Sequence, residues 1–168
     1  HCAYDFKPVR WDEIARVNVQ GSRKILECAR QAGVKKIICI SSISAYDGCR
    51  SLYGKAKLEI EKIALDNGAL IIRPGLVYGN GQGGMFGKLV AQLRNSSFIP
   101  MIGSGSQVQF LVHNKDLSGF IEKYSAGKNE ITPPIITAAN ERPWPFKAML
   151  LDIARALRSE ERRVGKEC

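Results

Sequence analysis

The sequence predicts an α/β protein with a parallel sheet, and three observations lead to this fold class. Residues 11–33 carry apolar side chains at helical spacing and end at a glycine. Residues 35–41 and 69–74 are short, almost continuous apolar runs, which are typical of strands buried on both faces. A second helical stretch, residues 52–68, separates these runs. Helices that alternate with buried strands indicate right-handed βαβ units.

The pattern loosens after Pro74, where glycine-rich loops separate the expected elements. These elements are a helix near 85–94, a strand over 107–113, a short helix from 115 and a last helix over 146–157. We therefore divide the chain into a sheet-forming part, residues 1–78, and a smaller region, residues 79–157.

Both ends of the chain read unlike an ordinary globular sequence. The opening "HCAYDF" has no initiator methionine and reads as the end of a strand already begun, so we expect sequence upstream. Residues 158–168 change abruptly to dense charge and match read-through of a common sequencing adapter. We expect this tail to be non-native and exclude it from the fold prediction.

Composition excludes several classes of protein. The 168 residues are 45% hydrophobic and 24% charged, which suits one globular domain. No segment approaches the roughly 18 uninterrupted apolar residues of a membrane span, so we expect a cytoplasmic protein without a membrane partner. Five cysteines without CxxC spacing and two distant histidines predict reduced thiols and no metal site.

The formal net charge of +9 raises nucleic-acid binding as one function class. The basic residues are scattered, without the clustered stripe and interleaved aromatic residues that follow a phosphate backbone. We therefore expect no nucleic-acid partner, and a steep salt dependence of DNA affinity would reveal one.

Polar side chains gather where the two buried strands end. Residues 41–44, "SSIS", follow the first strand and residues 73–79 follow the second. Tyr53 and Lys57 lie one helical turn apart in the helix between them. Ligands of open parallel sheets bind beyond the carboxyl ends of the strands, so these groups predict a site. From spacing alone, a purely structural interpretation has equal weight: the serines would cap helices, and Lys57 would be a solvated surface residue.

This set of side chains suits proton transfer to an oxygen. A phenol has a pKa near 10, but a cation at about 4 Å stabilises the phenolate by about 4 kcal/mol at an effective dielectric constant near 20. Such a neighbour would bring Tyr53 into working range for proton transfer. A serine hydroxyl could hold the same substrate oxygen. The pattern therefore predicts oxidation of an alcohol, or its reverse, with hydride passed to a cofactor.

Three longer stretches in order resemble the extended short-chain dehydrogenase/reductase family, in its epimerase/dehydratase group. They are "RVNVQGSRKILECARQAGVKKIICISSISAY", "YGKAK" and "IIRPGLVYG". The resemblance implies a Rossmann-like, doubly wound parallel sheet, of which this chain would hold the C-terminal part. It implies NAD or NADP as cofactor, and the residue that separates the two would lie upstream. Residues 1–78 would be the remaining part of the dinucleotide-binding domain with the active site, and residues 79–157 would be the substrate-binding region. As given, the chain is expected to be an inactive fragment without measurable NAD(P)H binding at micromolar cofactor.

The resemblance also implies site residues. The catalytic set would be Ser42, Tyr53 as acid and base, Lys57 and Asn18, the last through a proton network. Lys57 would hold the nicotinamide ribose and lower the pKa of Tyr53. The cofactor-binding set would be Ala3, Tyr4, Tyr53, Lys57, Pro74 and Val77, with Pro74 and Val77 offering backbone contacts to the carboxamide.

One glycine motif does not fit the role its pattern suggests. Residues 79–84, "GNGQGG", match G-x-G-x-x-G, but they follow Pro74 rather than a strand directly, and no acidic residue follows until Asp116. The dinucleotide fingerprint needs an acidic residue about 20 positions on. We interpret this segment as a substrate-side loop.

The same region bears on the substrate. Residues 67–115 contain no Asp or Glu but include Arg73, Lys88, Arg94 and Lys115, which indicates either an anionic substrate or a chance composition. Gln109 stands where the sugar-nucleotide members carry an arginine that grips a diphosphate. The short interval between Ser42 and Tyr53 also weakens a nucleotide-sugar assignment. We interpret His113 as a hydrogen-bonding residue at a strand end.

The sequence therefore predicts an NAD(P)-dependent oxidoreductase, epimerase or dehydratase that acts on a secondary alcohol or ketone, with sugar nucleotides among the candidates. The alternative is a non-catalytic dinucleotide sensor or scaffold of the same fold. The expected partner is a small molecule, and a homodimer is a candidate state of the full-length protein.

Overall fold

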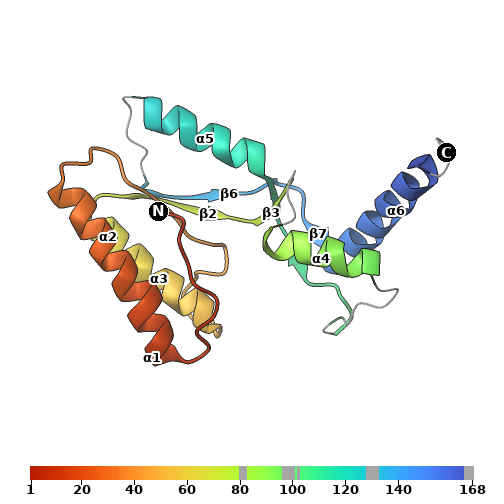
Figure 1. Cartoon of the computed structure of the whole chain (residues 1–168), viewed down its shortest axis with the longest axis horizontal. Coiled ribbons are helices and arrows are strands. Elements are labelled where there is room, and N and C mark those ends of the chain that lie inside the picture. Colours follow the sequence, from red (N-terminus) through yellow and green to blue (C-terminus); the bar gives the residue numbers. More distant parts are fainter. Residues whose placement is uncertain (80–82, 96–100, 102, 128–132, 165–168) are drawn as a thin grey trace. The chain divides into compact units, whose positions relative to one another are not determined.

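The structure is a computed structural model that describes residues 1–79, 83–95, 101, 103–127 and 133–164. The chain forms two compact units (Figure 1). The first comprises His1–Pro74 and Leu117–Ala138, and the second comprises Gly75–Asp116 and Ala139–Cys168.

The first unit is built on a three-stranded parallel sheet. Its strands are β1 (Ile38–Ile40), β2 (Leu70–Pro74) and β6 (Ile135–Ala138), in the order β1-β2-β6. The α/β fold with a parallel sheet is thus confirmed. The sequence prediction missed β6, because its four residues follow a proline pair and are too short to show a periodic pattern.

Helices lie on both sides of this sheet, with α2 and α3 on one side and α5 on the other (Figure 1). The predicted helix over 11–33 is a continuous helical run of three parts. They are α1 (Trp11–Ile14), a π-helical turn η1 (Ala15–Val19) and α2 (Gln20–Gln31). The other two helices are α3 (Leu52–Asp66) and α5 (Asn114–Ala126), the latter longer than the short helix expected from residue 115.

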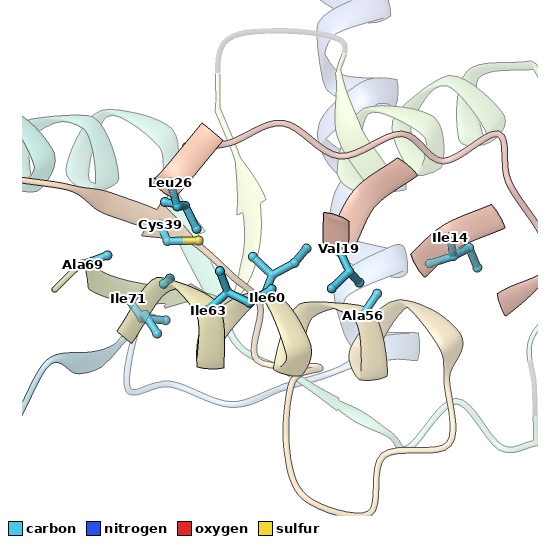
Figure 2. Close-up of a cluster of buried hydrophobic side chains, with 10 residues drawn as sticks. Ile14, Val19, Leu26, Cys39, Ala56, Ile60, Ile63, Ala69 and Ile71 are labelled. Carbon is cyan, nitrogen blue, oxygen red and sulfur yellow. The ribbon is translucent and has the colours of Figure 1, made fainter. Parts of the chain in front are cut away.

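The core of the first unit lies between the helices and the sheet (Figure 2). It contains Ile14, Val19 and Leu26 from the first helical run, Ala56, Ile60 and Ile63 from α3, and Cys39, Ala69 and Ile71 at the strands. Burial of such aliphatic side chains is the main source of stability in a domain of this size. It also fixes the rotation of α3 about its axis, and with it the direction in which Tyr53 and Lys57 point.

The second unit contains two small sheets and two helices. Strands β3 (Leu76–Tyr78) and β5 (Leu111–His113) pair in parallel, β4 (Val108–Gln109) and β7 (Trp144–Pro145) pair antiparallel, and the helices are α4 (Gly84–Asn95) and α6 (Phe146–Val164). The single strand expected over 107–113 is interrupted at Phe110, whose carbonyl accepts a hydrogen bond from the Leu76 amide at 2.7 Å. The backbone of residues 158–164 continues α6.

The glycine motif at 79–84 directly follows a strand, contrary to the prediction. Strand β3 ends at Tyr78 and α4 begins at Gly84, so the expectation that no strand directly precedes the motif is wrong. The pattern "LVY" was too short to indicate a strand. Residues 80–82 lie outside the described residues, and the lack of an acidic residue before Asp116 still distinguishes this segment from a dinucleotide fingerprint.

Two further searches cover only the residues that the structure describes. Among them no helix is both long and apolar enough to cross a bilayer. The same residues contain no group of three or more His, Cys, Asp or Glu side chains that could hold a metal ion.

Candidate active site

The loop after β1 lies against the carboxyl end of β2. The Ser41 amide donates to the Ile72 carbonyl at 2.7 Å, and the Ile43 amide donates to the Pro74 carbonyl at 3.2 Å. These bonds extend the parallel pairing one step past the strands. The hydroxyls of residues 41–44 are thereby held at the edge of the sheet where ligands of this fold class bind.

Helix α3 begins beside this loop and carries Tyr53 and Lys57 in its first two turns. The Ser51 hydroxyl caps the helix by accepting from the Gly54 amide at 3.0 Å. Lys57 is only 5% exposed, and its Nζ donates to the Ile40 carbonyl at 2.9 Å. A lysine this deeply buried is not part of a solvated helical face, so the alternative interpretation of Lys57 as a surface residue is excluded.

Tyr53 is half-buried. Burial raises the pKa of the Tyr53 phenol above its usual value of about 10, because it disfavours the phenolate, and the nearby Ser42 hydroxyl opposes this as a hydrogen-bonding group. The Ser42 Oγ also accepts from the Ser44 amide at 3.1 Å, which fixes the hydroxyl. The structure thus places the side chains of Ser42 and Tyr53, two of the four predicted catalytic residues, near each other.

The expected effect of Lys57 on Tyr53 is wrong for this structure. The Lys57 Nζ lies 5.9 Å from the centre of the Tyr53 ring and 5.2 Å from that of Tyr4, while its donated hydrogen bond goes to the backbone. The net change of the Tyr53 pKa is upward. The prediction counted the attraction between two charges and left out the cost of burying a phenolate.

An aromatic cluster surrounds the Tyr53 ring. The Ile40 amide donates to the His1 carbonyl at 3.0 Å, so the first residues run beside β1 and deliver Tyr4. The Tyr4 ring meets Tyr53 edge-on with centroids 5.0 Å apart, and Phe6 stacks on Tyr53 at 5.7 Å and 23°. Phe6 is nevertheless 73% exposed. The sequence prediction missed Phe6, although residues 4 and 6 of an extended segment share one face.

Asn18 holds the segment that carries these rings. It is 5% exposed in the π-helical turn, its Oδ1 accepts from the Asp5 amide at 2.7 Å and its Nδ2 donates to the Asp5 carbonyl at 3.0 Å. The amide therefore satisfies both backbone groups of the residue between Tyr4 and Phe6. These contacts place Asn18 on the backbone of Asp5 instead of on Tyr53 or Lys57, and its part in a proton network stays a prediction.

Arg73 does not have the role in anion binding that the acid-poor stretch suggested. Its Nε and Nη2 donate to the two carboxylate oxygens of Glu61 at 2.8 and 2.6 Å. The Glu61 side chain is 4% exposed and that of Arg73 is 25% exposed. The guanidinium is committed to an internal ion pair, which corrects the expectation that it forms part of an anionic-substrate wall. Glu61 was missed, although it lies one turn after Lys57 on α3.

The remaining predicted cofactor contacts are less defined by the structure. Ala3 is exposed beside the aromatic cluster, and Pro74 is buried at the end of β2 with its carbonyl bonded to the Ile43 amide. Val77 belongs to the second unit, where it pairs with Val112 of β5. The cofactor contacts of all three residues stay predictions from the resemblance.

His113 is a strand-end residue, as predicted. Its Nδ1 accepts from the Lys115 amide at 3.2 Å, and its ring meets the Tyr78 ring edge-on at 5.0 Å. Gln109 lies on β4, where it pairs with Trp144.

Ser41 has an unusual buried hydroxyl. The residue is 4% exposed, and among the described residues its Oγ has no hydrogen-bond partner. A buried hydroxyl without a partner costs about 1–3 kcal/mol, so natural proteins retain one only where something else requires it. Its place at the carboxyl end of β1, next to Ser42, fits a hydroxyl that binds a polar ligand.

Replacing Ser41 with Ala is therefore expected to leave the free chain as stable as the wild type or to raise its free energy of unfolding by about 1 kcal/mol. Urea unfolding without ligand measures this, with Ser22→Ala as control because the buried Ser22 hydroxyl is bonded to His1 at 2.8 Å. A loss of stability in Ser41→Ala equal to that in Ser22→Ala would show that the Ser41 hydroxyl has an internal partner.

Comparison with known proteins identifies relatives of this chain. Residues 4–131 match the model of the NAD dependent epimerase/dehydratase family. The chain is 27% identical over 126 residues to N-acetyl-alpha-D-glucosaminyl-diphospho-ditrans,octacis-undecaprenol 4-epimerase of Escherichia coli O157:H7. This match covers 63% of this chain and 38% of the relative. It is 35% identical over 103 residues to ceramide reductase of Caulobacter vibrioides, which covers 60% of this chain and 32% of the relative.

Solved structures show the same fold. UDP-glucuronic acid 4-epimerase from Bacillus cereus, in complex with UDP-glucuronic acid and NAD, matches with a TM-score of 0.72 at 20% identity, over 91% of this chain and 54% of that chain. The chain thus spans about a third of the curated relatives it matches and about half of this solved one.

Proposed function

Because the chain belongs to the NAD dependent epimerase/dehydratase family, we propose that it carries the proton-transfer site of an enzyme that oxidises a secondary alcohol or reduces a ketone. The observation that carries this proposal is that the Ser42 side chain lies near the Tyr53 phenol, and that Tyr53 lies one helical turn before the buried Lys57. Binding of a dinucleotide alone does not require a phenol in this position. The catalytic function is therefore favoured over a sensor or scaffold.

Tyr53 would transfer the proton of the reacting oxygen. Since burial raises its pKa, the phenol is neutral at neutral pH and ready to donate a proton to a carbonyl oxygen during reduction. In the oxidative direction Tyr53 must first lose this proton, so oxidation is expected to speed up toward alkaline pH. The Ser42 hydroxyl, fixed by the Ser44 amide, would hold the same oxygen.

The residues around Tyr53 fit a dinucleotide. NAD or NADP, when bound, supplies the group that accepts or returns the hydride of the carbinol carbon. Lys57 has three N–H donors and uses one of them on the Ile40 carbonyl, and the Ser41 hydroxyl faces no described partner. The remaining donors of Lys57 would hold sugar hydroxyls of the cofactor.

The surroundings of Tyr53 also bear on the class of substrate. Exposed Phe6 stacks on the catalytic ring, so a substrate that reaches Tyr53 passes an aromatic face. The two curated relatives are named for a substrate on undecaprenol and for ceramide, both of which carry long apolar chains. We favour a substrate with an apolar part over a free sugar nucleotide.

The test uses the complete gene product that contains this chain. It is incubated with NAD or NADH and with UDP-glucose, undecaprenyl-diphospho-N-acetylglucosamine or the ketone form of ceramide, and products are followed by NADH absorbance and chromatography. We expect turnover with an apolar-chain substrate, and Ser42→Ala to lower it by about 10²-fold or more. Ser44→Ala, in the same loop, is the control. Cofactor binding without turnover on any compound would favour the sensor, and turnover of UDP-glucose alone would overturn the substrate class.

A further inference from the structure

Two aromatic side chains of the first segment pack against the Tyr53 ring. Tyr4 meets this ring edge-on with centroids 5.0 Å apart, and Phe6 stacks on it at 5.7 Å with 23° between the planes. The Tyr4 and Phe6 rings lie 4.9 Å from each other. Offset and edge-on arrangements are favourable for aromatic rings, so the three rings form one cluster that includes the proposed proton donor.

Packing alone does not hold Phe6 in this place. Phe6 is 73% exposed, so few neighbouring atoms enclose its ring. A ring that is open to solvent can leave its neighbour when the backbone that carries it rotates. The stack of Phe6 on Tyr53 therefore depends on the backbone conformation of residues 4–6.

Three hydrogen bonds fix this backbone at Asp5. The Asn18 Oδ1 accepts from the Asp5 amide at 2.7 Å, and the Asn18 Nδ2 donates to the Asp5 carbonyl at 3.0 Å. The Asp5 Oδ1 accepts from the Lys7 amide at 2.9 Å, which closes a tight turn around Phe6. The residue between Tyr4 and Phe6 thus has both of its backbone groups and its carboxylate engaged.

Asn18 joins this exposed segment to the interior. It is 5% exposed and lies in the π-helical turn η1, a rare geometry that is frequent at functional sites. Its amide offers one acceptor and one donor to the same residue, so it fixes both the position and the direction of that residue. The helical run that carries Asn18 packs into the core through Ile14, Val19 and Leu26, so the core anchors the clamp.

We propose that Asn18 is a positioning residue that holds Phe6 on the Tyr53 ring, and that Phe6 is a specificity-determining residue that contacts an apolar group next to the substrate carbonyl. The second half rests on the proposed function, in which Tyr53 protonates the reacting oxygen. A ketone bound at Tyr53 has its substituents within reach of the stacked ring. An aromatic face favours an apolar substituent, whereas a hydroxyl loses hydration there without gaining a hydrogen bond.

The positioning half is tested by NMR on the free chain, through the nuclear Overhauser effects between the ring protons of Phe6 and Tyr53. We expect these effects in the wild type and their loss in Asn18→Asp, which fills the same space but replaces the donor with an oxygen. Ser22→Ala is the matched control, because Ser22 is buried in the same helical run and is bonded to His1 of the same segment. The contact between the rings should persist in this control.

A second variant keeps this test decisive if the buried carboxylate prevents folding. Asn18→Ala removes the clamp without burying a charge, and the contact between the Phe6 and Tyr53 rings should again be lost. Retention of this contact in either folded variant overturns the proposal, as does an equal loss in Ser22→Ala. Failure of both Asn18 variants to fold also overturns it, since Asn18 would then serve stability alone.

The specificity half is tested with two small methyl ketones, acetophenone with a phenyl group and hydroxyacetone with a hydroxymethyl group. Their binding to the chain is followed by the shifts of the Tyr53 ring signals. We expect the wild type to bind acetophenone more tightly, and Phe6→Ala to weaken this binding by about 3–10-fold without affecting hydroxyacetone. Phe6→Tyr keeps the ring and should keep the preference.

Two results contradict the role of Phe6 in specificity. One is that the wild type binds both ketones equally or binds neither, and the other is that Phe6→Ala and Phe6→Tyr lose the preference to the same extent. No cofactor and no turnover enter these experiments. Their failure is therefore distinct from failure of the proposed function, which turnover by the complete gene product decides.

Discussion

Replacing Tyr53 with Phe is expected to lower turnover of the complete gene product by about 10²–10⁴-fold, the usual contribution of a positioned proton donor. The change deletes one hydroxyl near Ser42 and leaves the ring against Tyr4 and Phe6. Cofactor affinity should stay close to that of the wild type, because the ring surface and Lys57 are retained. The loss therefore lies in kcat, as for an interaction made in the transition state.

Tyr46→Phe is the matched control for this experiment. Tyr46 lies in the loop between β1 and α3, but its side chain is 57% exposed. Removal of its hydroxyl should change turnover less than twofold. Steady-state kinetics and NADH titration of both variants separate the two residues. Near-normal turnover in Tyr53→Phe would show that another group moves the proton.

The local part of the site could be predicted from the sequence. The spacing of Tyr53 and Lys57 within an uninterrupted helical pattern placed both on one face of α3. The two buried strands placed residues 41–44 at the carboxyl end of the parallel sheet. These features depend on periodicity over a few residues, which the sequence displays directly. The same holds for the parallel pairing of β1 with β2.

What the sequence did not predict depends on contacts between distant residues. The Glu61–Arg73 pair joins α3 to β2, and the Asn18–Asp5 contacts join the π-helical turn to the first segment. The direction of the Tyr53 pKa shift follows from its burial, which no spacing reveals. Strands of two to four residues, such as β3 and β6, carry too few positions for a periodic pattern.

Gly54→Ala is expected to be the most disruptive single-methyl change at the site. Gly54 lies in the first turn of α3, where a Cβ would clash with the Ser44 carbonyl oxygen and would meet the Cys49 Sγ and Ser51 Oγ at 2.9 Å each. The Ser44 oxygen belongs to the backbone, so either the loop or the helix must move. Overpacking of this kind costs about 1–3 kcal/mol.

The expected loss outweighs the usual gain from replacing a helical glycine. In an open helix position, Gly→Ala stabilises by about 0.5–1 kcal/mol. Gly21 in α2 offers this control, because a Cβ there meets nothing within 4 Å. Urea unfolding should therefore show a more stable Gly21→Ala chain and a less stable Gly54→Ala chain.

Displacement of the loop from α3 should also affect catalysis. The Ser44 amide fixes the Ser42 hydroxyl, and Gly54 directly follows Tyr53. The same methyl group should therefore move apart the two hydroxyls that we propose to hold the substrate oxygen. A misplacement of about 1 Å in such a pair costs about 10²-fold in rate. Equal stability and equal turnover in Gly54→Ala and Gly21→Ala would show that the close approach of α3 to the loop after β1 is not required for the site.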